Sequence, residues 1–355
     1  GETEASSRHE RLEDLPRLAL ALRDTIVAAR SPVILTHANP DADAVASALA
    51  MAAVCEHLGV PPVLVAAGDA ALPTNLGFIR GADRLTHLDD AFIASSDLVI
   101  YVDCADISRL GPLFDRATDD LKRQRASINV DHHVTNTRFA TLNIVLPHAA
   151  ATAEILTGIC DALELDLGSD EATTLLAGIY GDTLGLRTPS TTPTTLRFAA
   201  RLLEEGADVD TIVDALFRLK PYSTVCLWGE ALQRTQWRGS LIWTQIDPDI
   251  LARAEADRAE AEGIVNFLAG TIGARAAALL YEESWGWRVS MRSISDEVNV
   301  AEILEPHNGG GHPRAAGARL EPGEEARDRF LDAIAARLGP RVNRPFNGAG
   351  LDEPV

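Results

Sequence analysis

The sequence predicts an α/β protein with a mostly parallel sheet and flanking helices, then a helical linker, then a smaller mixed α/β domain. Short apolar runs typical of buried strands alternate with helical patterns up to about residue 205. Beyond that point the spacing changes, and a second set of strand-like runs begins with "SLIWTQI". A chain of 355 residues is long enough for about two domains, and its 46% of hydrophobic residues can fill their cores.

The first domain is expected to cover residues 1–205, and its elements follow from the hydrophobic periodicity. An amphipathic helix over 11–30 leads into alternating strands and helices. The helix that follows the first strand ends at Gly59, a residue that often closes helices. The predicted strands are 31–37, 61–67, 97–106 and 126–133, and the predicted later helices are 43–59, 151–165, 169–180 and 193–205.

A helical linker is expected over 206–235 and the second domain over 236–342. Its predicted strands are 240–246, 274–283 and 285–293, and its predicted helices lie near 254–269 and 323–338. The segment 343–355 is rich in Pro and Gly, and we expect it to be a flexible tail.

Composition and charge exclude several classes of function. The formal net charge of −20 argues against a broad grip on long nucleic acid, which needs a basic stripe, but allows a small phosphorylated ligand in one pocket. No apolar run reaches the roughly 18–20 residues of a membrane span, and the start "GETEASSRHE" lacks the apolar core of a signal peptide. The four cysteines are widely spaced, which favours a reducing compartment. We therefore expect a cytoplasmic protein without membrane partners.

Acidic side chains and histidines follow the apolar runs of the first domain. The segments are "THANPDADA", "YVDCAD", "NVDHH" and "GIYGDT", which supply His37, Asp41, Asp43, Asp103, Asp106, Asp131, His132, His133 and Asp182. Because the carboxyl ends of parallel strands meet at one edge of a sheet, most of these groups are expected to converge there. Burying an unpaired carboxylate or imidazolium costs several kcal/mol, so they need solvent or a partner.

The pooled carboxylates predict bound cations. Two close carboxylates repel by roughly 4 kcal/mol at an intermediate dielectric, which a cation would offset. Oxygen ligands with a few imidazoles suit Mn²⁺, Mg²⁺ or Fe²⁺. Asp41, Asp43, Asp103 and Asp182 carry four negative charges, enough to neutralise two divalent ions. A two-metal site can bind a phosphate and lower the pKa of a water, so phosphoester hydrolysis is the natural reaction.

Simpler interpretations exist for single residues. Asn39 or Asp41 can cap a helix, and Asp103 can act as a cap or an ion-pair partner. Cys104 is expected to be a small buried residue, and His57 and His148 are expected to be structural or surface histidines. The functional interpretation depends on convergence of the four segments, which periodicity alone does not demonstrate.

The second domain contains "HNGGGHPRAAGA" at 307–318. Consecutive glycines let the backbone approach an anion and point its amides at it, although a plain turn explains them as well. His312 and Arg314 could add donors there. Arg292 and Ser293, at the end of a predicted strand, would supply a cation and a hydroxyl if that strand abuts the loop.

Taken together, these segments resemble the DHH phosphoesterase superfamily. "HANPDADAVAS", "VDCAD", "VDHH" and "GIYGDTLGLR" are similar to its four successive motifs, and "GGGHPRAAG" to the signature of its associated C-terminal domain. The combination resembles the nano-RNase and pAp-phosphatase branch, where pAp is 3′-phosphoadenosine 5′-phosphate. The resemblance runs from about residue 30 to 340.

The resemblance implies a role for each matching residue. His37, Asp41 and Asp103 would surround one ion; Asp43, Asp103, His132 and Asp182 would surround the other. Asp131 would orient a neighbouring histidine, and His133 would face the substrate and assist catalysis. The far phosphate or nucleotide of the substrate would be held across the interdomain cleft by Arg292, Ser293, Gly309, Gly310, Gly311 and His312, with Arg314 as a further candidate.

The resemblance also implies the activity. We expect a manganese-dependent phosphodiesterase or phosphatase that acts on short oligoribonucleotides, on the 3′-phosphate of pAp, or on both. The alternatives are a cyclic or linear dinucleotide phosphodiesterase and, in another class, a non-catalytic nucleotide-binding regulator. Relatives commonly pair through the first domain, which makes a homodimer an expectation. Leu184 departs from the family pattern before Gly185 and is expected to reshape the loop with Arg187; Arg314 is another varying position, so both bear on substrate choice.

Overall fold

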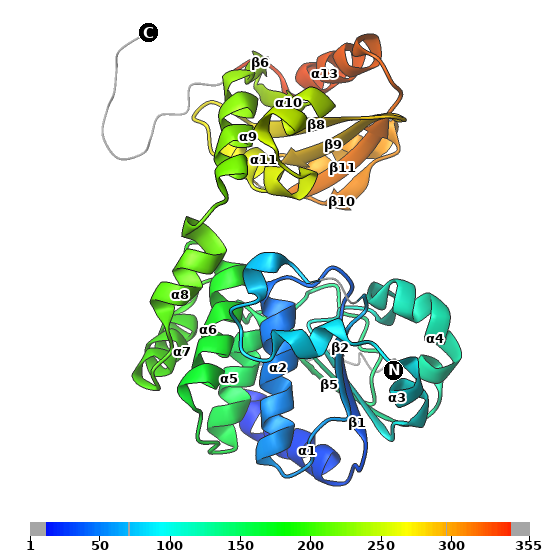
Figure 1. Ribbon diagram of the computed structural model, residues 1–355, viewed down its shortest axis with the longest axis vertical. Coiled ribbons are helices and arrows are strands. Elements are labelled where there is room, and N and C mark those ends of the chain that lie inside the picture. Colours follow the sequence, from blue (N-terminus) through cyan, green and yellow to red (C-terminus); the bar gives the residue numbers. More distant parts are fainter. Residues whose placement is uncertain (1–11, 70–71, 296, 342–355) are drawn as a thin grey trace, which may run out of the picture. The chain divides into compact units, whose positions relative to one another are not determined.

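The computed structural model describes residues 12–69, 72–295 and 297–341 and forms two compact units, residues 1–219 and 220–355 (Figure 1). The boundary between the units falls inside the segment predicted as a helical linker. That segment contains α8 (Val209–Val213), a π-helical turn (Asp214–Arg218) and α9 (Tyr222–Gln233). The predicted tail from residue 343 lies outside the described residues.

The first unit contains a five-stranded sheet in which every neighbouring pair is parallel, in the order β2-β1-β3-β4-β5. The predicted parallel sheet is therefore confirmed. The strands are β1 (Pro32–Thr36), β2 (Leu64–Ala67), β3 (Leu98–Val102), β4 (Ala126–Asp131) and β5 (Leu142–Val145). The last strand was not predicted. The order reverses direction between β1 and β3, and ligands of such sheets bind at the carboxyl ends of the strands beside this reversal.

Helices cover both faces of this sheet, as both of its faces are apolar (Figure 1). One face packs against α1 (Leu15–Val27), α2 (Ala42–His57), α5 (Thr152–Ala162) and α6 (Ser169–Thr183), with α7 (Pro193–Glu204) outside them. The other face packs against α3 (Asp90–Ser95) and α4 (Pro112–Lys122). Short 3₁₀ helices occupy Leu12–Asp14, Thr74–Leu76, Ala82–Thr86 and Ile107–Leu110.

Helices α2 and α6 approach closely because small residues line their contact. A Cβ at Gly178 would lie 2.6 Å from the Cβ of Ala153 and 2.9 Å from a carboxylate oxygen of Asp43, closer than real Cβ contacts. A Cβ at Gly181 would likewise lie 2.7 Å from the Cβ of Ala42. The small residues of α2 and α6 thus bring the start of α2 against the end of α6.

We expect Gly178→Ala and Gly229→Ala to change stability in opposite directions. The methyl group at residue 178 has no space, and overpacking of a core costs about 1–3 kcal/mol. Gly229 lies inside α9, and a Cβ added there would meet nothing within 4 Å among the described residues, so alanine should stabilise by about 0.5–1 kcal/mol. Chemical denaturation of both variants measures the two signs, and a neutral Gly178→Ala would contradict this packing.

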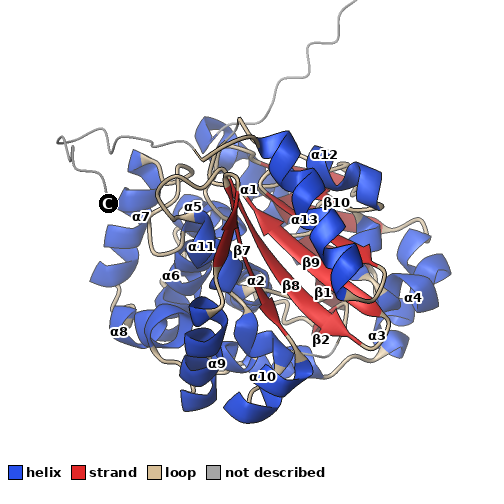
Figure 2. Ribbon diagram, turned by 90° about the horizontal axis from the view of Figure 1, so that it is seen from above, coloured by secondary structure: helices blue, strands red, loops and turns tan. Residues whose placement is uncertain are grey.

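The second unit contains a six-stranded mixed sheet in the order β10-β11-β9-β8-β7-β6. Of the described strand pairs in this sheet, only β7 and β8 run parallel. The strands are β6 (Gln236–Arg238), β7 (Leu241–Ile246), β8 (Ala276–Glu283), β9 (Gly286–Arg292), β10 (Gly310–His312) and β11 (Ala315–Leu320). Helices α12 (Val300–Leu304) and α13 (Glu324–Leu338) cover one face, and α9, α10 (Pro248–Ala254) and α11 (Ile264–Ala269) cover part of the other (Figure 2). The predicted smaller mixed domain is confirmed.

Two local predictions for this unit were wrong. The predicted helix 254–269 is interrupted, because Glu255 and Gly263 adopt positive φ angles of 50° and 93° and a 3₁₀ helix, Arg258–Ala261, lies between them. The glycine run is neither a free loop nor a plain turn, because Gly310 and Gly311 belong to the edge strand β10. A side chain at Gly309 or Gly311 would collide with β11, so the glycines allow this close pairing.

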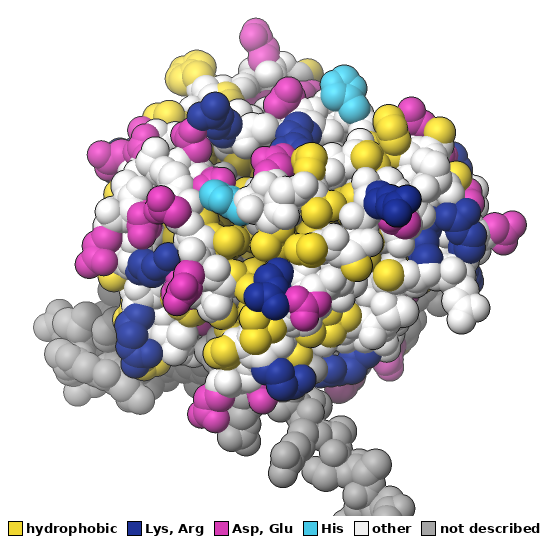
Figure 3. Space-filling model, turned by 90° about the horizontal axis from the view of Figure 1, so that it is seen from below, with side chains coloured by type: hydrophobic (Ala, Val, Ile, Leu, Met, Phe, Trp, Pro, Cys, Tyr) yellow, Lys and Arg dark blue, Asp and Glu magenta, His cyan; other side chains and the backbone are white. Residues whose placement is uncertain are grey.

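Among the described residues, none of the helices has the length and apolar character needed to cross a membrane. On the face seen in Figure 3, Lys and Arg side chains are scattered among Asp and Glu and form no continuous basic stripe over the described residues. All four cysteines are free, and Cys55, Cys104 and Cys160 are buried.

Candidate metal centre

The first two residues of the candidate centre follow β1 and β3, the strands beside the reversal of the sheet. His37 comes directly after β1 and Asp103 directly after β3. Both side chains are buried, and the Nε2 atom of His37 lies 3.5 Å from Asp103. Asp103 has a φ of 52°, which is strained for a residue with a side chain. The strained residue is thus the one whose carboxylate lies beside His37 and His132.

The other residues come from β4 and from two helix ends. His132 follows β4, and its Nε2 atom lies 3.0 Å from Asp182 and 3.7 Å from Asp103. Asp182 lies in the last turn of α6, and Asp41 and Asp43 begin α2. Asp41 also caps α2 by accepting a hydrogen bond from the backbone amide of Ala44. It is therefore the helix cap that the sequence allowed as well as a member of the cluster.

These side chains form two adjacent groups whose ligand atoms could each hold a metal ion. The groups are His37, Asp41 and Asp103, and Asp43, His132 and Asp182. A third combination joins Asp103 with both His132 and His133. In that third set, however, the Nδ1 atom of His133 is hydrogen-bonded to Asp131 at 2.7 Å, which makes it a poor ligand atom.

The two histidines of the groups are oriented by backbone carbonyls. The Nδ1 atom of His37 contacts the carbonyl of Ala38 at 2.8 Å, and that of His132 contacts the carbonyl of Ala149 at 3.3 Å. A proton on Nδ1 leaves Nε2 to face the carboxylates in both residues. Such partners fix the ring orientation of histidines that bind metal.

The start of α5 holds Asp43 and Asp103, a contribution that the sequence analysis missed. The amides of Thr152 and Ala153 donate hydrogen bonds of 2.7 and 2.9 Å to Asp43, which is fully buried. The hydroxyl of Thr152 donates to Asp103 at 2.9 Å. A helix N-terminus favours a negative charge, so the start of α5 offsets part of the cost of burying this carboxylate. Nothing in "ATAEIL" distinguishes this threonine from an ordinary core residue.

We expect Thr152→Val to weaken metal binding by about 10-fold or more while leaving the fold intact, because the groups that orient a ligand contribute 10–100-fold to metal affinity. Isothermal titration with Mn²⁺ measures the change. Thr157→Val is the matched control: this buried hydroxyl lies further along α5 and donates to the carbonyl of Ala153. Equal losses in both variants would contradict a role of Thr152 at Asp103.

Asp131 and His133 form a pair beside the groups. The carboxylate of Asp131 is fully buried and accepts hydrogen bonds from His133, at 2.7 Å, and from the side-chain amide of Asn136, at 2.6 Å. The hydrogen bond to Asp131 is the largest cause that raises the pKa of His133. The side chain of His133 is 36% exposed, so its other ring nitrogen remains accessible to a ligand.

Electrostatics of the metal-free centre couple its histidines to its carboxylates. Burial works against the charged form of His37, but its hydrogen bonds to Asp103 and Ala38 outweigh burial and raise its pKa to about 9. For His132, burial is likewise outweighed, chiefly by Asp182 and Asp43, and its pKa is raised to about 10. Burial and the neighbouring carboxylates Asp103 and Asp182 raise the pKa of Asp43 well above its usual value.

The residues present fit divalent cations. Within the described part of the chain, the only basic groups within 4.0 Å of Asp103 are histidines, so no Lys or Arg neutralises the carboxylates there. Four carboxylates and two imidazoles in two adjacent groups match the ligand preferences of Mn²⁺, Mg²⁺ or Fe²⁺. The cluster is therefore able to bind metal.

The candidate substrate residues lie in the second unit. Arg292 ends β9, and its register partner on β11 is Ala315, which also pairs with His312 of β10. Ser293 is buried, and its hydroxyl donates to the carbonyl of Ser295, so it closes a local turn. Arg314 lies with an exposed side chain in the turn between β10 and β11.

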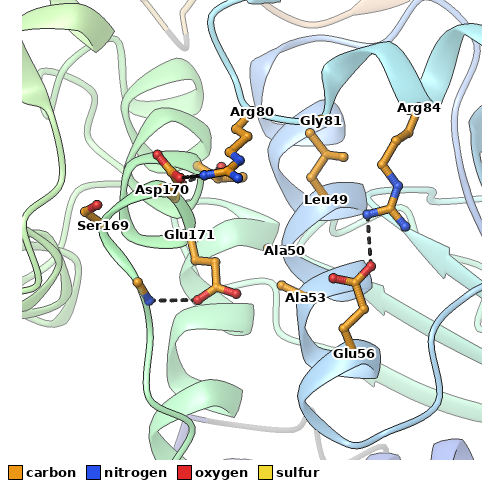
Figure 4. A pocket seen from close by; sticks show the side chains of 12 residues that line it. Leu49, Ala50, Ala53, Glu56, Arg80, Gly81, Arg84, Ser169, Asp170 and Glu171 are labelled. Atoms are coloured by element: carbon orange, nitrogen blue, oxygen red, sulfur yellow. Dashed lines mark hydrogen bonds and ion pairs between the residues drawn. The ribbon is translucent and has the colours of Figure 1, made fainter.

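A separate hollow of about 510 Å³ in the first unit does not belong to the centre (Figure 4). It is lined by the start of α6 and the later turns of α2, whereas Asp182 lies at the other end of α6, roughly 18 Å along the helix. Most of its charged groups pair with one another: Arg80 with Asp170, and Arg84 with Glu56. Glu171 pairs instead with His57.

Comparison with known proteins shows the family of this chain. Residues 32–179 match the N-terminal domain of the DHH family, and residues 240–339 match the DHHA1 domain. The chain is 31% identical to a bifunctional oligoribonuclease and PAP phosphatase, NrnA, of Thermus thermophilus, over 89% of this chain and 93% of that protein. It belongs to the DHH family. All the predicted metal residues except Asp182 lie within the first matched range.

Solved structures of other proteins show a similar fold. An exopolyphosphatase-related protein from Bacteroides fragilis superposes with a TM-score of 0.82 at 21% identity, over 90% of this chain and 96% of that one. RecJ of Thermus thermophilus, solved in complex with Mn²⁺, superposes with a TM-score of 0.52 at 15% identity, over 96% of this chain and 57% of that one. The fold is thus that of a DHH domain followed by a DHHA1 domain.

Proposed function

We propose that this DHH-family phosphoesterase hydrolyses short oligoribonucleotides and the 3′-phosphate of pAp at a two-metal centre. The observation that carries the proposal is the pair of adjacent ligand groups beside Asp103 at the carboxyl edge of the parallel sheet. The similarity to the Thermus oligoribonuclease and PAP phosphatase over almost the whole of both chains supports this choice of substrates.

His37, Asp41 and Asp103 would hold one ion, and Asp43, His132 and Asp182 the other, with Asp103 contributing to both. Bound divalent ions would neutralise the phosphate charge and supply a water with a lowered pKa. Mn²⁺ is the ion we propose, because the ligand set mixes carboxylates with imidazoles and because RecJ was solved with this ion.

His133 has the geometry of a proton donor to the substrate. Asp131 accepts its Nδ1 proton, which directs the accessible Nε2 atom away from the carboxylate. The hydrogen bond to Asp131 also raises the pKa of His133, which favours the form with both ring nitrogens protonated. The imidazole can then donate a hydrogen bond to a phosphate oxygen or to the leaving oxygen. Asp131 acts through His133 as a positioning residue.

The second unit would hold the rest of the substrate through Arg292 and the amides of Gly309, Gly310 and Gly311. Gly310 is exposed on the edge strand β10, and no described atom lies within 4 Å of its Cβ position, so a ligand can approach the backbone there. Ser293 and His312 remain candidates, and Ser293 would have to release Ser295 to contribute its hydroxyl. A homodimer and a cytoplasmic location remain predictions, the latter supported by the four free cysteines.

A turnover panel tests the proposal. The purified protein with Mn²⁺ is compared on pAp, on RNA of two to five nucleotides, on linear and cyclic dinucleotides, and on pyrophosphate. We expect selective hydrolysis of short RNA, pAp or both. Preferential hydrolysis of cyclic dinucleotides would instead support the alternative, a dinucleotide phosphodiesterase. Binding of all substrates without turnover, with metal bound, would instead support a non-catalytic nucleotide-binding protein.

A further inference from the structure

A hollow of about 400 Å³ on the second unit gathers arginines in an otherwise acidic protein. Arg258, Arg288 and Arg292 line it together with Tyr281 and Ser290. It lies on the face of the sheet that α11 covers only in part. The hollow thus brings three guanidinium groups together in a chain whose formal net charge is −20.

The arginines of β9 form a row along one face of the sheet. Residues 288, 290 and 292 alternate with the buried Trp287, Val289 and Met291, so their side chains share the open face. Arg292 stands at the end of the row beside the start of β11. Arg288 stands at the other end, opposite Tyr281 of β8.

Two of these arginines lack an acidic partner among the described residues. No carboxylate oxygen in the described ranges lies within 4.0 Å of Arg288 or Arg292, although Glu262 also lines the hollow. Burial lowers the pKa of Arg292, and its guanidinium donates to the carbonyl of Met291. Glu262 acts on Arg292 only from beyond 4.0 Å, so this half-buried guanidinium carries a desolvation cost that an anionic ligand in direct contact would offset.

The wall of the hollow beside Arg288 is built by Tyr281 and Arg258. Arg258 lies over the ring of Tyr281, 5.0 Å from its centroid, and pairs with Glu283. Its Nη2 atom is buried without a hydrogen-bond partner among the described residues. Arg258 and Tyr281 thus place a second guanidinium group and an aromatic ring in the wall of the hollow that Arg288 also lines.

We propose that Arg288, with Arg258 and Tyr281 beside it, forms a second phosphate subsite that holds one more nucleotide of a short RNA than Arg292 alone can reach. The proposal rests on the proposed function and adds the residues that sense substrate length. Four residues of strand separate the Cα atoms of Arg288 and Arg292 by roughly 13 Å. Because both side chains line the same hollow, their guanidinium groups can contact different phosphates of one chain.

The test measures binding without metal, so that no substrate is hydrolysed. Oligoribonucleotides of two, three and four nucleotides without terminal phosphates carry one, two and three phosphates, and each is titrated calorimetrically into the chelator-treated full chain. For the unaltered protein, we expect affinity to rise between two and three nucleotides. In Arg288→Ala this rise should disappear, with a loss of about 10-fold for the trinucleotide and less than about twofold for the dinucleotide.

Arg319→Ala is the matched control. Arg319 is the register partner of Arg288 on β11, but it lies over Trp285 and does not line the hollow. Arg288→Lys should recover part of the rise, because it keeps the charge. An equal loss for all lengths, or no loss for any, would overturn the subsite. Failure of the unaltered protein to hydrolyse RNA or pAp would instead overturn the proposed function, since binding is measured separately.

Discussion

Asp103→Asn is expected to lower turnover of a short oligoribonucleotide or pAp by at least about a thousandfold, equivalent to ~4 kcal/mol of transition-state stabilisation. Asp103 lies 3.5 Å from His37 of one ligand group and 3.7 Å from His132 of the other, and it accepts a hydrogen bond from Thr152. The amide has nearly the same shape but lacks the charge that both ions would share. Steady-state kinetics at saturating Mn²⁺ measures the loss.

Asp106→Asn is the control for that experiment. Asp106 lies three residues further along the same loop, but its carboxylate caps the 3₁₀ helix Ile107–Leu110 and accepts from Ser108 and Thr137. It belongs to neither ligand group. We expect Asp106→Asn to keep most of the activity. A loss of turnover below about tenfold for Asp103→Asn would contradict the proposal that Asp103 contributes to both ion sites.

Metal affinity is expected to rise steeply with pH and turnover to vanish in chelator. In the metal-free protein the pKa values of His37 and His132 are raised to about 9 and about 10, so both imidazoles carry a proton on Nε2 at pH 7. A metal ion must displace each of these protons. Apparent affinity for Mn²⁺ should therefore rise about tenfold per pH unit for each histidine until the pH approaches 9.

The same pKa values predict the opposite trend for stability of the metal-free protein. A histidine whose folded pKa is raised stabilises the fold fully below its unfolded value of about 6.5, and this stability is lost as the pH rises through the folded value. The melting temperature of the chelated protein should thus fall between pH 6.5 and about 9, while Mn²⁺ affinity rises.

For the metal-binding prediction, calorimetry of Mn²⁺ binding in buffers of different ionisation enthalpy counts the protons that the two histidines release. Affinity that does not vary with pH would contradict the coupling.

Much of the centre could be predicted because its residues end strands. His37, Asp103 and His132 each follow an apolar strand of a parallel sheet, and the geometry of such sheets brings these positions to one edge. Asp43 and Asp182 were predicted as acidic residues that follow apolar segments, and the family resemblance assigned them to the same ion. Their approach depends on the glycines of α6. Periodicity alone does not indicate which helix end meets which strand.

The remainder depended on contacts that leave no pattern in the sequence. Thr152 reaches Asp103 from the first turn of α5, a position that resembles an ordinary apolar helix start. The helix expected over 254–269 breaks at Gly263, whose φ of 93° places it against the ring of Trp228. Arg288 and Tyr281 have no evident connection in the sequence, and only the register of β8 and β9 places them opposite each other.

The central claim is that two ions at the Asp103 cluster act together in phosphoester hydrolysis. The most direct measurement titrates the metal-free protein with Mn²⁺ while bound ions per chain and turnover of a short oligoribonucleotide or pAp are recorded in parallel. We predict two bound ions per chain, with turnover that rises as the second ion binds. Full turnover with a single ion, or two bound ions without turnover, would contradict the account.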